Sequence, residues 1–394
     1  MLRVLGVTIP GLEDFLCEEI RELIGATPAK VAPGKIEFLA SPEDVILMNY
    51  MSRTATRFLV VLFRGIIDPM NLENIKKAAL EVDWPTLFHY ESLFAVRAER
   101  TGNHEFTSVE VAATIGEAIV ERFLADTGNR IRANLRRPDV LVRAYVTGNL
   151  LIIGLDTSGE SLHRRGYRIF NHRTSLNPII AYSLVKLSKW LDTLRKDPEV
   201  PLIDPMCGGG TIPIEAVLAT QKVPPGKWRR YYPVEHIHLF SGVRQEEVMS
   251  WADSFILRDL NPCVVCMDIS PKSIAGAKLN ADSAGVKMKF LLGDASKLGE
   301  YFNRIGAVVT DPPFELRMGR NRRLSEVFRG MSESLQERLE LRFSAISAGP
   351  ALPKLMNAMR VLKLVYNRRI LYGGVEARLL AYERRNTKQE SCEG

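Results

Sequence analysis

The chain has 394 residues, of which 46% are hydrophobic and 25% charged, a composition that is ordinary for a globular protein and excludes extended disorder. This length predicts two or three domains, and no apolar run approaches the roughly 18 residues that a membrane span requires. The five cysteines favour a reducing compartment over a disulfide framework, so we expect a cytosolic protein without a secretory signal.

The first 160 residues predict two consecutive α+β domains, bounded at residues 1–64 and 65–160. In the first, hydrophobic periodicity predicts strand 2–7, helix 12–24, strand 36–39, a helix from its capping residue Ser41 to Met51, and strand 57–66. In the second, it predicts helix 72–82, strand 93–99, a helix 109–124 capped by Thr107 or Ser108, and strands 140–146 and 150–156 around a Thr-Gly-Asn turn.

The second half predicts a different architecture. Residues 161–192 are interpreted as a linker that ends in an amphipathic helix at 176–191. From residue 193 to 394, strands beginning near Leu202, Val264, Met288, Ala307 and Leu341 alternate with helical segments. Such alternation indicates a parallel, doubly wound α/β sheet, and the apolar segments 362–372 and 377–382 are expected to close it as an antiparallel pair.

A glycine loop follows the first strand of this half, in the run Asp204-Pro205-Met206-Cys207-Gly208-Gly209-Gly210-Thr211. Glycines allow a ligand to approach the backbone, and the helix that follows offers free N–H groups. The next strand-ending acid, Asp268, comes about 60 residues later instead of the roughly 20 of a dinucleotide site, and a phosphate-binding Gly-Lys-Ser/Thr is absent. A nucleotide without pyrophosphate fits better, with Asp268 at the ribose and Asp294 at an adenine amine, although any one of these acids could instead be a helix cap.

The fourth strand of the sheet leads into Asp311-Pro312-Pro313-Phe314. Prolines remove backbone donors, so the carbonyls of this turn are left as acceptors beside an aromatic face. This combination suits a planar nitrogen base with an exocyclic amine. The alternative is an ordinary strand-ending turn in which Phe314 belongs to the core.

Arginines are clustered in a chain whose net charge is +7. Nine arginines against three acids lie between residues 130 and 173, and a second cluster, which includes Arg317, Arg320 and Arg322, follows the Asp-Pro-Pro-Phe turn. Arginine forks suit phosphates, so the clusters indicate nucleic-acid binding, and a solvated basic face is the alternative.

The motifs together resemble the THUMP-domain-containing class I S-adenosylmethionine (SAM)-dependent tRNA (guanine-N2) methyltransferases. The glycine loop, Asp268, Asp294 and the Asp-Pro-Pro-Phe turn carry this resemblance in the second half, and Phe106-Thr107-Ser108, Asn134-Leu135-Arg136-Arg137 and Arg165-Gly166-Tyr167-Arg168 carry it in the first half and the linker. It implies a Rossmann-like methyltransferase domain preceded by ferredoxin-like and THUMP domains, with SAM as cofactor and a tRNA substrate. We expect a monomer. Leu316-Arg317-Met318-Gly319-Arg320 is similar to the subgroup that acts on the acceptor-stem guanosine at position 6, whereas Phe314-Glu315 departs from the usual Tyr-Gly.

The resemblance also implies roles for individual residues. The base-binding and catalytic residues are Asp311, Pro312, Pro313 and Phe314. The expected cofactor-binding residues are Asp204, Met206, Cys207, Gly208, Gly210, Thr211, Asp268, Ile269, Asp294, Ala295 and Asp311. The expected RNA-binding residues are Arg100, His104, Arg136, Arg137, Arg164, Arg165, Arg168, Arg317, Arg320 and Arg322.

Three alternatives accompany this interpretation. The same chemistry could act on adenine N6 of RNA or DNA, or the chain could be a catalytically inert tRNA-binding protein. A zinc site at Cys263, Cys266, His236 and His238 is weighed and set aside, because Cys266 lies in an apolar strand where a small buried side chain is the commoner role. Cys207 is expected to pack or to contact cofactor, and no metal is expected.

Overall fold

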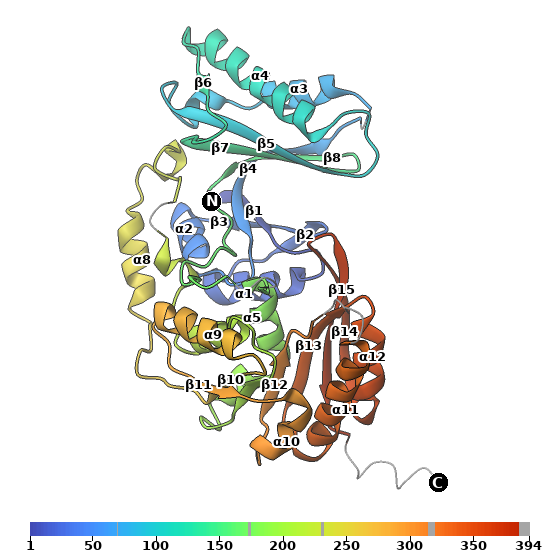
Figure 1. Ribbon diagram of the computed structural model, residues 1–394. Coiled ribbons are helices and arrows are strands. Elements are labelled where there is room, and N and C mark those ends of the chain that lie inside the picture. Colours follow the sequence, from blue (N-terminus) through green and yellow to red (C-terminus); the bar gives the residue numbers. More distant parts are fainter. Residues whose placement is uncertain (69, 172–174, 230–231, 314–319, 386–394) are drawn as a thin grey trace. The chain divides into compact units, whose positions relative to one another are not determined.

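The computed structural model describes residues 1–68, 70–171, 175–229, 232–313 and 320–385, and the chain divides into two compact units (Figure 1). Unit 1 comprises residues 1–8, 13–164 and 225–252, and unit 2 comprises residues 9–12, 165–224 and 253–394. None of the described helices is both long enough and apolar enough to cross a lipid bilayer.

Unit 1 is built on one continuous eight-stranded sheet with the order β2-β3-β1-β4-β8-β7-β5-β6. Its strands are β1 Leu2–Val7, β2 Ala29–Ala32, β3 Lys35–Ala40, β4 Arg57–Ile66, β5 Leu93–Thr101, β6 Arg132–Ala133, β7 Val140–Thr147 and β8 Leu150–Asp156. Its principal helices are α1 Glu13–Ile24, α2 Pro42–Met51, α3 Leu72–Leu80, α4 Ser108–Thr127 and α8 Gln245–Asp253. The antiparallel pairing of β4 with β8 makes the two predicted α+β segments share this sheet.

Local sequence explains where these helices begin. Ser41 and Thr107 both form capping boxes, in which the hydroxyl accepts from the N3 backbone and the N3 carboxylate accepts from the cap backbone. Helix α4 ends at Gly128, whose φ of 71° is the left-handed conformation that glycine adopts readily. The predicted cap at Ser41 is confirmed, and of the two candidates for α4 the structure selects Thr107.

Residues 225–252 lie far along the chain but belong to the core of unit 1. Tyr232, Val234, Ile237 and Phe240 are buried in the same hydrophobic cluster as α2 and α4. A side chain at Gly226 would collide with Tyr50 and Tyr232, so only glycine permits this approach. This stretch lies between β9 and β10 in the chain, and only the tertiary structure shows that it packs in unit 1.

Unit 2 is a seven-stranded sheet with the order β11-β10-β9-β12-β13-β15-β14. Its strands are β9 Leu202–Asp204, β10 Val264–Asp268, β11 Lys289–Leu292, β12 Ala307–Thr310, β13 Arg342–Ala348, β14 Lys363–Tyr372 and β15 Val375–Glu383. Strands β9 to β13 are parallel and β15 runs antiparallel to its neighbours, so the expected doubly wound sheet and its antiparallel closing pair are confirmed.

Helices cover both faces of this sheet (Figure 1). They are α5 Pro178–Leu187, α6 Trp190–Thr193, α7 Thr211–Thr220, α9 Pro271–Ala284, α10 Leu298–Tyr301, α11 Arg320–Arg338 and α12 Ala351–Ala358. The single helix predicted over 176–191 is wrong in one respect: it is broken into α5 and α6 at Lys189, whose φ of 63° lies in the left-handed region.

Candidate active site

Four aspartates mark the carboxyl edge of the unit 2 sheet. Asp204 and Asp268 end β9 and β10, and Asp294 and Asp311 come one or two residues after β11 and β12. These four parallel strands are consecutive neighbours in the sheet, so their carboxyl ends share one edge, where ligands bind in this architecture.

The glycine loop folds back onto the end of β10. Gly208 and Gly210 have φ values of 53° and 81°, which glycine adopts without strain. The Gly208 N–H donates to the Asp268 carboxylate at 2.9 Å, and the Cys207 N–H donates to the Met267 carbonyl at 2.9 Å. A Cβ at Gly210 would lie 3.1 Å from that of Ala277, so the loop also packs closely against α9.

Asp204 stabilises the start of this loop. Its carboxyl group is buried and accepts from the Met206 N–H at 3.2 Å, which holds the turn after β9. Burial raises the pKa of Asp204 well above its usual range, although the Met206 N–H opposes the shift. Because the side chain is only 1% exposed, the structure shows it shaping the loop from inside rather than facing a ligand.

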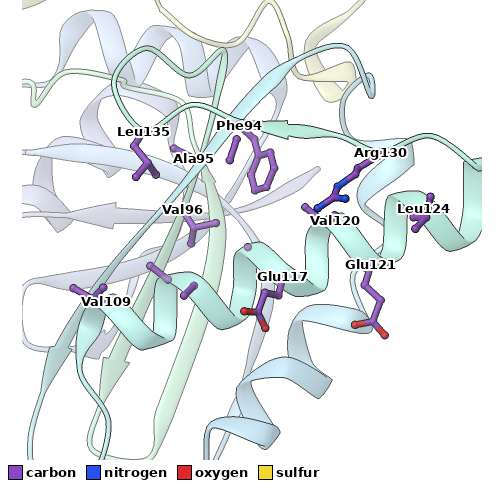
Figure 2. Close-up of a pocket in the computed structure, with 14 residues that line it drawn as sticks. Phe94, Ala95, Val96, Val109, Glu117, Val120, Glu121, Leu124, Arg130 and Leu135 are labelled. Atoms are coloured by element: carbon purple, nitrogen blue, oxygen red, sulfur yellow. The ribbon is translucent and has the colours of Figure 1, made fainter.

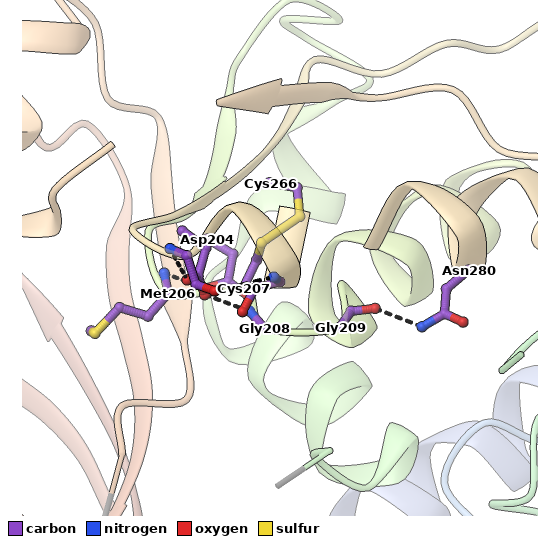
Figure 3. The surroundings of a disulfide bond; sticks show 10 residues. Asp204, Met206, Cys207, Gly208, Gly209, Cys266 and Asn280 are labelled. Atoms are coloured by element: carbon purple, nitrogen blue, oxygen red, sulfur yellow. Dashed lines mark hydrogen bonds between the residues drawn. A yellow bond between two sulfur atoms is a disulfide. The ribbon is translucent and has the colours of Figure 1, made fainter. Parts of the chain in front are cut away.

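A disulfide joins Cys207 in the loop to Cys266 in β10 (Figure 3). The two Cα atoms are 5.5 Å apart, a separation typical of disulfides. The expectation of wholly reduced cysteines is therefore wrong for this pair. The cysteine count could not reveal it, because 59 residues separate the two partners and the pairing of parallel strands β9 and β10 brings them together.

Two of the arginines predicted to bind RNA contact α7, the helix that follows the glycine loop. Arg165 is buried, and its Nε donates to Oε1 of Glu215 in α7 at 3.0 Å, with Tyr167 donating to the same oxygen at 2.9 Å. Arg168 donates to the Leu176 carbonyl and, at 2.8 Å, to the hydroxyl of Thr211, the first residue of α7. Arg165 is removed from solvent and paired to a carboxylate, which argues against its expected contact with RNA.

Sequence reasoning missed Asn280, which is 2% exposed. Its Nδ2 donates to the Gly209 carbonyl at 2.9 Å and to the Phe170 carbonyl at 3.1 Å, while its Oδ1 accepts from the N–H groups of Ile169 and Phe170. The Asn280–Gly209 contact is drawn in Figure 3. The available signal was an amide residue among the small, buried residues Gly276, Ala277, Ala281 and Ala284 of α9.

The edge beside Asp268 has the chemistry of an adenosine site. The Asp268 carboxylate is half-buried, and its Oδ1 accepts from the Ser270 N–H at 2.8 Å, which orients it at the strand end. Ile269 beside it is 56% exposed, an apolar surface suited to one face of a purine. Asp294 and the buried Ala295 begin the turn after the neighbouring β11, where Asp294 Oδ1 accepts from the Ser296 N–H at 2.9 Å. These residues fit the adenosine part of SAM.

The Asp-Pro-Pro turn stands on the other side of β9. Asp311 is partly exposed, Pro312 is buried and Pro313 is exposed. Burial raises the pKa of Asp311 to about 7, so its carboxyl group changes charge near neutral pH. Phe314 lies outside the described residues.

The remaining predicted RNA-binding residues do not form one cluster. In unit 1, Arg100 and His104 lie at the carboxyl end of β5, where His104 Nε2 is 2.7 Å from the Gly148 carbonyl. Arg136 and Arg137 are exposed near the opposite end of β5, because β6 pairs with its first residues, and both of their N–H groups donate to Asn134 Oδ1 at 3.1 Å. Exposed Arg164 pairs with Glu160 at 3.4 Å. Arg317 lies outside the described residues, as do the side chains of Arg320 and Arg322 at the start of α11.

A hollow lies in unit 1, between α4 and strands β5 and β6 (Figure 2). It has a volume of about 680 Å³ and is lined mainly by apolar side chains, with Glu117, Glu121 and Arg130 among them. None of the predicted site residues lines it.

Among the described residues, no group of three or more His, Cys, Asp or Glu side chains is placed to hold a metal ion. The two cysteines considered for zinc are separated in role, since Cys266 is bonded to Cys207 and Cys263 is free.

Three family models match consecutive parts of the chain. They are an RlmL ferredoxin-like domain at residues 5–59, a THUMP domain at residues 69–156, and an RMKL-like methyltransferase domain at residues 165–377. The chain is 36% identical over 334 residues to a tRNA (guanine(6)-N2)-methyltransferase of Methanocaldococcus jannaschii, with 83% of this chain and 85% of that protein covered. It is 28% identical to a protein of the same name from Archaeoglobus fulgidus, with 97% and 92% covered. The fold is similar to the crystal structure of TrmN from Thermus thermophilus, with a TM-score of 0.72, 24% identity, and 98% and 100% of the two chains covered.

Proposed function

Because this chain belongs to the family of RMKL-like methyltransferases that carry a THUMP domain, we propose that it methylates the exocyclic N2 amine of a guanosine in tRNA, with SAM as methyl donor. The observation that carries the proposal is the juxtaposition of the cofactor edge at Asp268 with the Asp311-Pro312-Pro313 turn, on strands that flank β9. The name of the two archaeal relatives supports guanine 6 as the target. We place this guanosine in the acceptor stem.

The cofactor residues have distinct tasks in this proposal. Asp268 accepts from the ribose hydroxyls, Ile269 covers a face of the adenine, and Asp294 and Ala295 hold its amine edge. The Cys207–Gly210 loop borders the amino-acid end, where its backbone approaches without side-chain obstruction. When bound, SAM supplies an electrophilic methyl group on a sulfonium.

Asp311 and Pro312 make the guanine N2 amine a better nucleophile in this proposal. The guanine N2 lone pair is delocalised into the ring, so the amine is a weak nucleophile until its N–H groups are held by acceptors. The Asp311 carboxylate and the Pro312 carbonyl are the two acceptors that localise this lone pair and aim it at the methyl group, and Phe314 supplies a stacking face. A paired base must leave its stack to reach them, at a cost of a few kcal/mol. Positioning accounts for much of the remaining rate gain.

Substrate binding is assigned to exposed basic groups of unit 1 and to the arginines that follow the Asp-Pro-Pro turn in the sequence. Arg136 and Arg137 present guanidinium groups from one turn, and their forks suit the phosphates of an RNA backbone. Arg100, His104 and Arg164 are further candidates, together with Arg317, Arg320 and Arg322. The monomeric state and the cytosolic location stay predictions.

The test is transfer of labelled methyl groups from SAM to bulk tRNA, followed by mass analysis of the nucleosides and mapping of the modified position. N2-methylguanosine at position 6 is the expected product. N6-methyladenosine would establish the adenine alternative, and a chain that does not bind SAM in calorimetry would be the inert tRNA-binding protein.

A further inference from the structure

The β14–β15 hairpin extends past the carboxyl edge of the unit 2 sheet. Ala377 of β15 pairs with Ala348, the last residue of β13, and also with Ile370 of β14. Ile370 is therefore level with the end of β13, and Tyr372 lies two residues farther out, next to the hairpin turn at 373–374. Strand β12 ends earlier, with Thr310 paired to Ala345 of β13. The Asp-Pro-Pro turn therefore follows β12 at the level of the last residues of β13.

The side chain of Tyr372 is turned toward the site rather than away from it. It shares a face of β14 with buried Ile370, because residues two apart in a strand point to the same side. A backbone hydrogen bond from Asn177, the N-cap of α5, reaches its phenol, and the charges of Asp311 and Arg168 both act on it. Arg168 itself contacts Thr211 at the end of the glycine loop, so Tyr372 lies within reach of charges from both the loop side and the Asp-Pro-Pro turn.

Asp311 and Tyr372 belong to strands that are not neighbours in the sheet. Strands β12 and β14 are separated by β13 and β15, which is three strand spacings, or about 14 Å. Asp311 and Tyr372 follow or end the strands on the two sides of this interval, and both side chains are partly buried.

The hydroxyl group of Tyr372 is protonated and is placed to act as a hydrogen-bond donor. Burial, followed by the nearby Asp311 charge, raises the pKa of Tyr372 above its usual range, so the hydroxyl keeps its proton at neutral pH. Its oxygen accepts from the Asn177 N–H, which leaves the O–H as a donor. The Asp311 carboxylate accepts hydrogen bonds, whereas the Tyr372 hydroxyl donates one.

We propose that Tyr372 binds the target base opposite Asp311 and donates its O–H to the ring nitrogen N3, which adjoins the reacting amine of guanine. This inference rests on the proposed function, since it assumes guanine N2 as the methyl acceptor. Asp311 then holds the N–H side of the amine while Tyr372 holds the acceptor side, and together they fix the base in its plane. Tyr372 acts on the RNA substrate and has no role in binding SAM.

The first test compares Tyr372→Phe with the wild type, and with Tyr366→Phe as a matched control on the same strand, six residues from the edge. The variant loses the O–H donor and also the acceptor of the Asn177 N–H. We expect a loss of up to about tenfold in kcat/KM for tRNA, an unchanged SAM affinity in calorimetry, and a melting temperature lowered by no more than a few degrees. Tyr366→Phe is expected to keep the wild-type kcat/KM. A wild-type kcat/KM for Tyr372→Phe, or an equal loss of SAM affinity, would overturn the proposal.

The second test removes the other partner of the hydrogen bond. A tRNA carrying 3-deazaguanosine at the mapped target position lacks the N3 acceptor but retains the amine. The wild type should lose about as much activity on this tRNA as Tyr372→Phe loses on normal tRNA, and the variant should lose nothing further. Additive losses would contradict the contact, whereas absence of N2-methylguanosine with the wild-type enzyme would contradict the proposed function instead.

Discussion

The ionisation of Asp311 makes the pH dependence of methyl transfer a direct test of its role. Burial raises the pKa of this carboxyl group to about 7, and only the ionised form has both oxygens free to accept from the amine. With this pKa, about one eleventh of the enzyme is ionised at pH 6 and about ten elevenths at pH 8, so kcat/KM should rise about tenfold over this interval. The sign is fixed by the chemistry, since protonation of an acid removes an acceptor.

The assay is steady-state methyl transfer at saturating SAM and varied tRNA concentration between pH 5.5 and 8.5. Asp311→Ala should lose more than tenfold in kcat, which corresponds to more than about 1.4 kcal/mol, while retaining SAM affinity. Asp311→Asn should lose the rise near pH 7, and Asp282→Asn, a change at an exposed carboxylate on α9, should keep it. A flat wild-type profile between pH 6 and 8, or an Asp311→Ala variant with more than a tenth of the wild-type kcat, would refute the assignment.

Three further predictions concern the loop and the RNA surface. Cys266→Ala removes a crosslink that closes 59 residues and should lower the unfolding free energy by up to about 4 kcal/mol; dithiothreitol should lower the melting temperature of the wild type but not of this variant, and equal sensitivity in both would argue against the disulfide. Asn280→Ala removes the bond to the Gly209 carbonyl and should weaken SAM binding in calorimetry by about tenfold, with unchanged affinity as the contrary result. Replacing Arg136 and Arg137 together by alanine should weaken tRNA binding and reduce its log–log salt slope by about two, and an unchanged slope would place the phosphate contacts elsewhere.

Local signals in the sequence were sufficient for the elements and for the residues at their ends. Helix caps such as Ser41 depend on contacts three residues away, and the acids that follow β9 to β12 lie at strand ends that periodicity identifies. Since parallel strands align their carboxyl ends, identifying these strands was enough to predict that Asp268 and Asp311 lie at one edge.

Whether an arginine is buried in an ion pair or exposed to solvent depended on tertiary contacts. Arg165 and Arg136 belong to the same arginine-rich stretch, yet one is buried against Glu215 and the other is exposed. The partner Glu215 is 50 residues away in the chain, in a helix whose packing on the linker no local pattern specifies. Clustering of arginines therefore indicated a basic region but could not separate phosphate ligands from structural ion pairs.

The amino-acid sequence by itself determined the class of fold, the glycine loop and the Asp-Pro-Pro turn, because each depends on residues that are adjacent in the chain. Only the tertiary structure decided that Cys207 meets Cys266, that Asn280 holds the loop, that residues 225–252 complete the core of unit 1, and that Tyr372 reaches the edge opposite Asp311. The physical reason is shared by all four: the partners lie tens of residues or more apart in the chain, and the sheets and helices bring them together.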